Sequence, residues 1–496
     1  MNKPRSAIKR RRTKGRNLNT PTLRLFIDGT WTPSSDSATF ETFDPATEEV
    51  VANVARGTRE DVDRAIHAAR KAVDGEWRAT LPKRRVELLY ELSRALEGRA
   101  EEFAELETRD SGKPIQRSRR EIASTVRYFR YYAGAADKVQ GSTIPLGPDY
   151  LDFTLREPLG VTAHIIPWNA PLNMIGRSVA AALAVGNTAV VKPATETPLT
   201  ALLLGELFEQ VGIPAGVYNV VTGPGSDVGA YLTHHPEIDG ITFTGSIETG
   251  RQVMHAAAEH ITPLVLELGG KSPSLIFADA DIASATAQTV KGIYSNSGQF
   301  CNACSRLIVH SSIKDQVIHH LVEQVSRLRI GPGIEGTDMG PLISQTQYDR
   351  VLNFIRIGQE DGAELIAGGG RPVGLDRGYF IAPTILDRVG PDTQIAQEEI
   401  FGPVLAILTF DDEDEAITLA NNTPYGLAAG IFTKDLNRAL RLATNIRAGQ
   451  IYVNEYFAGG EETPFGGYKQ SGFGREKGLE ALLHYTQTKN VAIRIY

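Results

Sequence analysis

Short apolar runs alternate with helical patterns through the middle of the chain. NTAVV, VYNVV, ITFT and LVLE are compact apolar runs, and the segments between them repeat apolar residues at every third or fourth position. Alternation of this kind is typical of parallel strands joined by crossover helices. It predicts an α/β protein with a doubly wound parallel sheet, in which ligands bind at the carboxyl ends of the strands.

The pattern resumes near residue 274 and changes at both ends of the chain. SLIFADADI, RLIVHSSI and VLAILTF indicate a second α/β unit, whereas residues 59–137 show only helical spacing and predict a helical layer. LRLFIDGTW at 23–31 indicates a first strand with an Asp-Gly turn. The apolar end HYTQTKNVAIRIY predicts a strand that pairs with another subunit or with a strand between domains, because an unpaired edge would promote aggregation.

Composition narrows the class of protein. A chain of 496 residues with 42% hydrophobic and 22% charged residues can form two or three domains with ample core. No run of about 18 apolar residues occurs and only two cysteines are present, so the sequence predicts neither a membrane span nor a disulfide framework. We therefore expect a cytoplasmic protein.

The first sixteen residues are strongly basic, although the whole chain has a net charge of -7. They contain KRRR at 9–12 and no acidic residue. The acidic remainder argues against a nucleic-acid role for the folded part, but the tail could bind phosphate backbones or act as an organellar address. A segment of this composition cannot build a core, so residues 1–20 are predicted to be a disordered tail.

Both cysteines lie in GQFCNACSR at 298–306. Cys301, among small and polar residues, is a candidate nucleophile because the thiolate is the most reactive side chain near neutral pH. A small buried hydrophobe is the alternative, and the C-x-x-C spacing of Cys301 and Cys304 also fits a redox pair or half of a zinc site. No second C-x-x-C or H-x3-H is present, so no metal site is predicted.

Several polar residues interrupt or end the predicted strands. Glu267 lies within the apolar LVLELGG, where burial would raise its pKa and suit a general base, although a salt-bridged glutamate fits equally. Asn169 follows an apolar run and could donate to an oxyanion or simply begin a turn. Lys192 ends a strand, and the turn at 245–250 opens a helix whose N-terminus could receive a phosphate. By itself each signal is weak.

Eight motifs together carry a much stronger signal. They are PWNAPL at 167–172, VVKP at 190–193, VVTGPG at 220–225, FTGS at 243–246, ELGGKSP at 267–273, GQFC at 298–301, EEIFGPV at 398–404 and PFGGYKQSGFGRE at 464–476. In these motifs and their order, the chain resembles the aldehyde dehydrogenase superfamily from about residue 23 to residue 496. The resemblance implies an NAD(P)-binding domain at 21–140 and 161–266, a catalytic domain at 267–476, and a small bridging β-sheet arm for oligomerisation from 141–160 and 477–496.

The resemblance also implies a reaction. Cys301 would attack an aldehyde to form a thiohemiacetal, whose oxyanion Asn169 and the Cys301 N–H would hold. After hydride transfer to NAD(P), Glu267 would activate the water that hydrolyses the thioester to a carboxylic acid. An acylating enzyme that passes the thioester to coenzyme A is an alternative, although Glu267 favours hydrolysis. A non-catalytic cofactor-binding protein with a nucleic-acid-binding tail is another, and the intact active-site residues argue against it.

The resemblance assigns cofactor contacts to a larger set of residues. They are Ile166, Trp168, Lys192, Thr195, Gly225, Gly229, Phe243, Gly245, Ser246, Leu268, Glu399 and Phe401. Thr195 departs from the family, because NAD-preferring members commonly have a glutamate there that bonds the adenosine ribose and repels a 2'-phosphate. We therefore expect NADP to be accepted, alongside NAD.

The substrate channel and the partners are less well defined by the sequence. The resemblance suggests Arg177, Tyr456 and Phe465 for the channel, with Ala170 and Ser178 making it wider and more polar. Arg177 favours an anionic aldehyde, whereas three glutamates of the mouth loop favour a cationic one, and simple solvation explains all four charges equally. These glutamates are Glu455, Glu461 and Glu462. We expect a homodimer or homotetramer, and Cys304 is either inert or pairs with Cys301 on oxidation.

Overall fold

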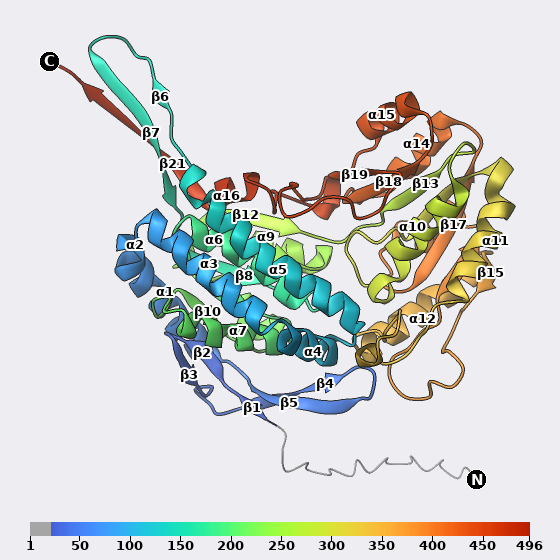
Figure 1. The fold of residues 1–496 in the computed structure, drawn as a ribbon, viewed down its shortest axis with the longest axis horizontal. Coiled ribbons are helices and arrows are strands. Elements are labelled where there is room, and N and C mark those ends of the chain that lie inside the picture. Colours follow the sequence, from blue (N-terminus) through green and yellow to red (C-terminus); the bar gives the residue numbers. More distant parts are fainter. Residues whose placement is uncertain (1–20) are drawn as a thin grey trace, which may run out of the picture.

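The computed structural model describes residues 21–496, so the predicted basic tail falls outside the described residues. Figure 1 shows two α/β halves side by side and a narrow three-stranded arm that projects from the first half. Parallel pairing dominates the large sheet of each half, and the predicted α/β fold class is confirmed.

The first half is built around a sheet with eight strands within the described chain, in the order β20-β12-β11-β8-β9-β10-β2-β3. Its centre is parallel and its edges are antiparallel. Val191 packs in one apolar cluster and Val190 in another, so both faces of the sheet are buried. The strands are β2 (Leu25–Ile27), β3 (Thr30–Thr32), β8 (Val161–Ile165), β9 (Thr188–Lys192), β10 (Tyr218–Val220), β11 (Gly240–Thr244), β12 (Leu264–Glu267) and β20 (Gly472–Phe473).

Helices cover both faces of this sheet and include the helical layer expected over residues 59–137 (Figure 1). The first helix begins with a capping box, in which the side chains of Thr58 and Asp61 each accept the other residue's backbone N–H. The helices are α1 (Arg59–Asp74), α2 (Glu76–Ala79), α3 (Pro82–Gly98), α4 (Ala100–Ser111), α5 (Ile115–Ala135), α6 (Pro171–Ala184), α7 (Leu199–Gln210), α8 (Ala230–Thr233), α9 (Ile247–His260) and α16 (Glu480–His484).

The second half has a seven-stranded sheet among the described residues, in the order β15-β16-β17-β14-β13-β18-β19. Only the β15–β16 pair of this sheet is antiparallel. Its strands are β13 (Pro273–Ile276), β14 (Arg306–His310), β15 (Glu364–Ala367), β16 (Thr384–Asp387), β17 (Val404–Phe410), β18 (Ala428–Phe432) and β19 (Gln450–Val453). Its helices are α10 (Ile282–Tyr294), α11 (Lys314–Val325), α12 (Gln345–Glu360), α13 (Gln394–Gln397), α14 (Glu413–Asn421) and α15 (Leu436–Asn445).

The arm consists of β6 (Thr143–Ile144), β7 (Tyr150–Pro158) and β21 (Thr486–Arg494) in the order β21-β7-β6. The last strand therefore pairs within its own chain, with Thr486 opposite Pro158 and Arg494 opposite Tyr150. The outer edge of β21 has no strand beside it within residues 21–496.

Three features differ from the expected layout. A second three-stranded sheet, formed by β1 (Thr22–Leu23), β4 (Thr39–Asp44) and β5 (Glu49–Ala55), was not predicted. The strand β20 comes from the segment assigned to the catalytic domain but joins the sheet of the first half. The helix α16 comes from the segment assigned to the arm but contacts α6. Chain ends of this kind cross between halves because they complete a sheet edge or cover an apolar face. The remaining domain boundaries stay a prediction.

Candidate active site

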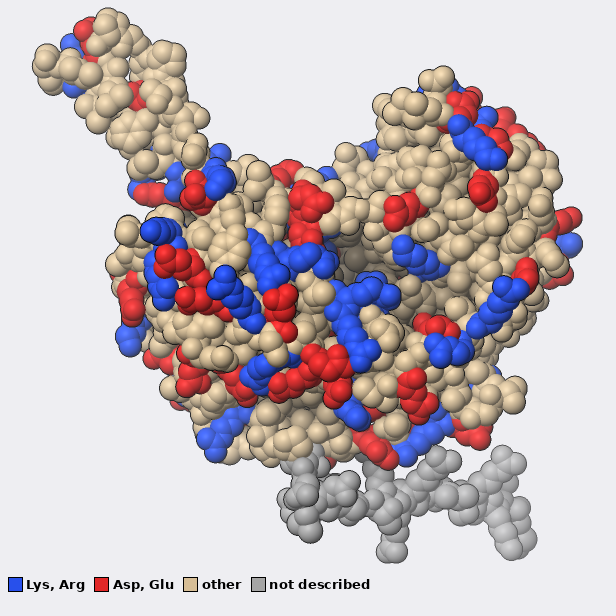
Figure 2. Space-filling view, viewed as in Figure 1, with Lys and Arg blue, Asp and Glu red and all other residues tan. Residues whose placement is uncertain are grey.

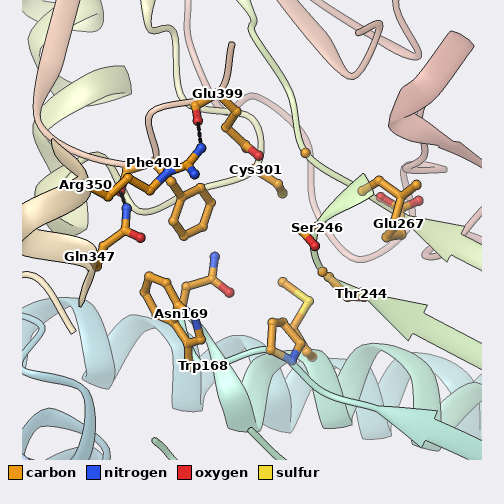
Figure 3. Close-up of a pocket in the computed structure, with 15 residues that line it drawn as sticks. Trp168, Asn169, Thr244, Ser246, Glu267, Cys301, Gln347, Arg350, Glu399 and Phe401 are labelled. Atoms are coloured by element: carbon orange, nitrogen blue, oxygen red, sulfur yellow. Dashed lines mark hydrogen bonds between the residues drawn. The ribbon is translucent and has the colours of Figure 1, made fainter. Parts of the chain in front are cut away.

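A cavity of about 280 Å³ lies where β8, β11 and β12 end, between the two halves. Figure 3 shows its side chains converging from both halves. The lining residues are Pro167, Trp168, Asn169, Met174, Thr244, Gly245, Ser246, Glu267, Leu268, Gly269, Cys301, Gln347, Arg350, Glu399 and Phe401. All three predicted catalytic residues, Cys301, Glu267 and Asn169, are among them.

The turn before Cys301 has an unusual backbone. Asn296, Ser297 and Gly298 have φ angles of 50°, 57° and 73°, which is three consecutive residues in the left-handed region. A Cβ at Gly298 would also collide with the carbonyl of Gly402, so the turn packs directly on the loop that follows Phe401. This backbone holds Cys301 at the cavity wall.

The two glycines after Glu267 explain how several groups fit into so small a space. A Cβ at Gly270 would collide with the Cys301 carbonyl oxygen, and one at Gly269 would collide with the Glu399 carboxylate. The Gly270 N–H donates to Glu399 Oε1 at 3.1 Å. The Gly-Gly pair therefore brings the backbone of Cys301 and the side chain of Glu399 against the end of β12.

Asn169 lies just before α6 and its side chain points into the cavity (Figure 3). One amide hydrogen is donated from Nδ2 to the Gln299 carbonyl at 3.0 Å, while Asn296 donates to the Asn169 carbonyl at 3.3 Å. These bonds fix Asn169 to the cysteine turn. Because an amide carries two hydrogens, the second can serve a developing oxyanion.

The surroundings of the Cys301 thiol favour its protonated form. Burial raises its pKa to about 12, against the opposing effect of the nearby Arg177 guanidinium. A thiol with this pKa is a poor nucleophile at neutral pH until a further positive charge lies beside it.

Glu267 is the last residue of β12 and is buried at the cavity. Neither carboxylate oxygen accepts a hydrogen bond from the described residues, and its nearest cation is Arg177 Nη2, at 3.4 Å from Oε2. Burial raises the pKa of Glu267 well above its ordinary value, and Arg177 only partly offsets this. A carboxylate of this kind is a stronger base than one in water.

The structure places Arg177 behind the catalytic residues and not in an open channel. It is buried, with Nε paired with Glu476 and its guanidinium 4.2 Å above the ring of Phe465. Burial alone would lower the pKa of Arg177, but Glu476 and Glu267 raise it above its ordinary value. Glu267 and Glu476 both pair with Arg177. This pairing argues against the role suggested from the sequence, in which Arg177 binds an anionic substrate.

Other predicted channel residues are also buried in the protein. Tyr456 is fully buried in the core of the second half, and its hydroxyl donates to the Asn302 carbonyl at 3.0 Å. It was suggested for the substrate channel, but it does not line this cavity. Ala170 and Ser178 are buried too, and Ser178 donates to the Met174 carbonyl. These side chains therefore add no polar surface to the cavity.

Cys304 lies in the same core as Tyr456 and is fully buried. Its thiol donates to the Thr289 carbonyl at 3.4 Å, and burial raises its pKa above the ordinary value. Pairing with Cys301 would require this thiol to leave the core, so the structure favours the inert role.

Glu399 and Phe401 meet the cavity from the second half. The Phe401 ring lies 5.1 Å from the Trp168 ring in an edge-to-face arrangement. Burial raises the pKa of Glu399 to about 7, which the Gly270 N–H partly offsets. Figure 3 shows Gln347 and Arg350 next to Phe401 and Glu399 at the same side of the cavity.

Gln347 and Arg350 were not predicted. Gln347 Nε2 donates to the Phe401 carbonyl at 2.8 Å, and Arg350 Nη2 donates to the Glu399 carbonyl at 2.8 Å. Both lie on α12, whose sequence shows only an ordinary amphipathic pattern. Polar residues on the outer face of such a helix give no signal that distinguishes a site from a solvated surface.

The remaining predicted cofactor residues lie near the ends of β9 and β11. Ser246 caps α9 by accepting the Thr249 N–H, and Thr195 donates to the Gly223 carbonyl at 3.1 Å. Lys192 is buried without a carboxylate in ion-pair contact among residues 21–496, and burial lowers its pKa to about 8. Gly225 and Gly229 flank its side chain, and the Ile166 N–H donates to the Lys192 carbonyl at 3.0 Å. Phe243 is buried on β11, which β8 separates from β9. A buried, unpaired ammonium at the end of β9 and a capped helix N-terminus after β11 both fit the phosphates of a dinucleotide.

The helices and the potential metal ligands of residues 21–496 form neither a membrane span nor a metal-binding cluster. No helix there is long and apolar enough to cross a membrane. No group of three or more His, Cys, Asp and Glu side chains there lies where it could hold a metal ion.

The sequence profile of the aldehyde dehydrogenase family matches residues 31–491. The chain belongs to this family. It is 48% identical over 477 residues to aldehyde dehydrogenase 1 of Tanacetum cinerariifolium, covering 95% of each chain. It is 45% identical over 478 residues to a hydroxyisobutyraldehyde dehydrogenase of Mycolicibacterium austroafricanum, covering 96% of this chain and 94% of that one.

Solved structures of aldehyde dehydrogenases are equally similar. An NAD+ complex from Bacillus cereus has a TM-score of 0.94 at 44% identity, covering 96% of this chain and 97% of that chain. A betaine aldehyde dehydrogenase from Staphylococcus aureus in complex with NAD+ has a TM-score of 0.93 at 39% identity, covering 95% of this chain and 94% of that chain. This protein is therefore an NAD(P)-dependent aldehyde dehydrogenase, which oxidises aldehydes to carboxylic acids.

Proposed function

We propose that the enzyme is hydrolytic, with Cys301 as nucleophile, Asn169 as oxyanion donor and Glu267 as general base. The observation that carries this proposal is the single cavity that all three side chains line, in which the Glu267 oxygens have no hydrogen-bond donor among the described residues. A buried carboxylate without such a donor is free to bind a water molecule.

The first half of the reaction is carried by the cysteine turn. The Cys301 thiol first loses its proton to solvent. Its Sγ then bonds to the aldehyde carbon, and the carbonyl oxygen becomes an oxyanion held by the Asn169 amide and the Cys301 backbone N–H. Trp168, Phe401 and Glu399 would hold the nicotinamide end of NAD(P), and Lys192 and Ser246 the phosphate end. When bound, NAD(P) would supply the hydride acceptor and, in its oxidised form, a positive charge.

The second half of the reaction is hydrolysis of the Cys301 thioester. Glu267 takes a proton from the attacking water, because burial has raised its pKa. Cleavage of the carbon–sulfur bond then releases the acid and the Cys301 thiolate. Arg177 opposes the rise in the pKa of Glu267 that burial causes.

Replacing Glu267 by glutamine tests this assignment. Glu267→Gln should give one stoichiometric burst of reduced cofactor followed by slow turnover, with the acyl group on Cys301 in mass spectrometry. Glu462→Gln, at an exposed position, is the matched control and should turn over normally. No burst and no adduct would place Glu267 in cysteine activation, and undiminished turnover would remove it from catalysis. Faster thioester transfer to coenzyme A than to water in the native enzyme would support the acylating alternative.

We also propose that NADP is accepted alongside NAD. Thr195 has no negative charge and its hydroxyl is committed to the Gly223 carbonyl, while the nearby Lys192 ammonium can attract a 2'-phosphate. Initial rates with both cofactors provide the test. An efficiency with NADP more than about a hundredfold below that with NAD, about 2.7 kcal/mol, would contradict this proposal.

We further propose that the arm joins subunits into a homodimer or homotetramer. Tyr150, Leu151, Leu155 and Ile493 are exposed on β7 and β21, and β21 has an open edge within the described chain. Exposed apolar side chains beside an open strand edge favour pairing with another chain. Light scattering coupled to gel filtration measures the state, and a monomer at micromolar concentration would refute the proposal. A cytoplasmic location stays a prediction.

A further inference from the structure

One arginine of α5 has no acidic partner. Four of its five arginines each lie within ion-pair distance of a carboxylate, whereas Arg120 has none among residues 21–496. The pairs are Arg117 with Glu121, Arg119 with Glu101, Arg127 with Glu461, and Arg130 with Glu97. Because arginine has five N–H donors in a fixed fork, an unpaired guanidinium is a ready site for a carboxylate or phosphate.

The position of Arg120 on α5 places it beside the approach to the nucleophile. Arg117, one turn before it, lies with its guanidinium 4.3 Å above the ring of Phe300, the residue that precedes Cys301. Ser124, one turn after it, donates to Glu461 Oε1 at 2.7 Å. Residues three and four apart share one helix face. Arg120 therefore lies between the cysteine turn and the loop after β19, which carries Glu461.

The surface around this helix face is consistent with an entrance. Figure 2 shows a hollow between the two halves, and Lys and Arg side chains gather on its rim over the N-terminal half of α5. The rings of Phe300 and Phe457 lie 6.0 Å apart, so the cysteine turn and the loop after β19 meet here. A substrate that reaches Cys301 from this side would pass a positively charged rim.

The charged groups around Arg120 do not neutralise its positive charge. Partial burial and repulsion by Arg117 both lower its pKa, and only Glu121 opposes them. Glu461, which the sequence suggested for a cationic substrate, is already bonded to Arg127 Nε at 2.9 Å. Arg177, which the sequence suggested for an anionic substrate, is used by Glu267 and Glu476. Arg120 is thus the arginine that remains available on this helix.

We propose that Arg120, with Arg117 beside it, binds an anionic group at the far end of the aldehyde, so that the enzyme prefers carboxylated or phosphorylated aldehydes to neutral ones. This inference rests on the proposed function, in which the aldehyde carbon reaches Cys301. Arg117 would contribute by keeping the Glu121 carboxylate away from Arg120, since its Nε donates to Glu121 Oε1 at 2.6 Å. The opposite preference, for a cationic aldehyde bound by the exposed Glu455, is an outcome of the same test.

The test compares four aldehydes on the full-length enzyme: propanal, succinate semialdehyde, glyceraldehyde 3-phosphate and an aminoaldehyde. The native enzyme should oxidise at least one of the two anionic aldehydes with a higher kcat/KM than propanal, and the better of them identifies the anion. Arg120→Gln should lower the ratio of anionic to neutral efficiency about tenfold, mainly through KM. Arg120→Glu should lower it further. Arg119→Gln, at the adjacent paired arginine, is the matched control and should keep the native ratio.

Three results would overturn the inference: an aminoaldehyde oxidised best, no preference between anionic and neutral aldehydes, or a ratio that Arg120→Gln leaves unchanged. The readout is a ratio between substrates, so it does not depend on which residue acts as base. If Glu267→Gln turned over normally while Arg120→Gln lowered the ratio, the catalytic assignment would fail and the binding assignment would stand.

Discussion

Replacing Arg177 by methionine should expose how strongly the catalytic carboxylate depends on a buried charge. Arg177 is buried between Glu267 and Glu476, and both carboxylates are themselves buried. Methionine keeps much of the apolar volume and removes the charge. The variant would contain two buried carboxyl groups without their shared cation, so each would be driven toward its neutral form.

The size and pH dependence of the effect follow from these contacts. Removing one partner of a buried ion pair costs about 3–5 kcal/mol. For 496 residues, an unfolding entropy of about 2 cal/mol/K per residue gives about 1 kcal/mol/K, hence a melting temperature lower by about 3–5 °C. Burial already raises the pKa of Glu267 and of Glu476, and loss of Arg177 raises both further. A carboxyl whose pKa is raised by folding stabilises the protein below its unfolded pKa, and that contribution is lost as pH rises through the folded pKa. The free energy of unfolding of the variant should therefore be close to that of the native protein near pH 5. At alkaline pH it should be lower by the full amount, about 3–5 kcal/mol.

Catalysis should shift in the same direction. If Glu267 must be ionised to activate water, a higher pKa moves the rise of kcat with pH to higher pH. Thermal melts and kcat profiles between about pH 5 and pH 9 measure both effects, with Arg177→Lys as a variant that restores charge and should recover most of each. Arg119→Met, which breaks only an exposed pair, should change stability by about 0–1 kcal/mol. Equal melting of Arg177→Met and native protein at alkaline pH, with an unmoved kcat profile, would refute this reasoning.

Three further predictions concern the same site. Cys301→Ser should lower dehydrogenase turnover by several orders of magnitude, whereas Cys304→Ser should keep most of it; equal losses in steady-state assays would mean that the wrong sulfur has been assigned. Gly270→Ala should lower kcat/KM about a hundredfold, because its Cβ would displace the Cys301 carbonyl, while Gly370→Ala meets no atom within 4 Å and should be silent in the same assay. Lys192→Met should weaken NADP binding more than NAD binding in fluorescence titrations, and equal weakening would remove Lys192 from contact with the 2'-phosphate.

The parallel sheets could be predicted because each buried strand leaves a local signal in the sequence, and the residues of the candidate site could be predicted because eight motifs occur together in one order. The strand β9 is buried on both faces and reads as a continuous apolar run, which distinguishes it from an exposed strand. Cys301, Glu267 and Asn169 lie within motifs whose glycines and prolines are required by the backbone at that point. Gly270, for example, has no room for a side chain against Cys301.

The partners of charged side chains could not be predicted in this way. Arg177 closely follows the PWNAPL motif, whereas Arg120 lies well before the first of the eight motifs and was not singled out from the sequence. One is paired with Glu476, which lies some three hundred positions later, and the other has no carboxylate partner among the described residues. Pairing over such separations depends on how β20 and the segment after it return to the first half, and periodicity carries no information about that. The channel assignment of Arg177, made from the sequence, could not take this pairing into account.

The connection between the two sheets has a consequence for the chemistry itself. Glu267 ends β12 in the first sheet, Pro273 begins β13 in the second, and the short link between them contains Gly269 and Gly270. That link touches the Cys301 carbonyl and the Glu399 carboxylate. The proposed base, nucleophile and cofactor contact therefore all adjoin one stretch of backbone. A motion that changed the angle between the halves would have to deform this link, so the distance from Glu267 to Cys301 should vary less between conformations than the width of the entrance beside α5.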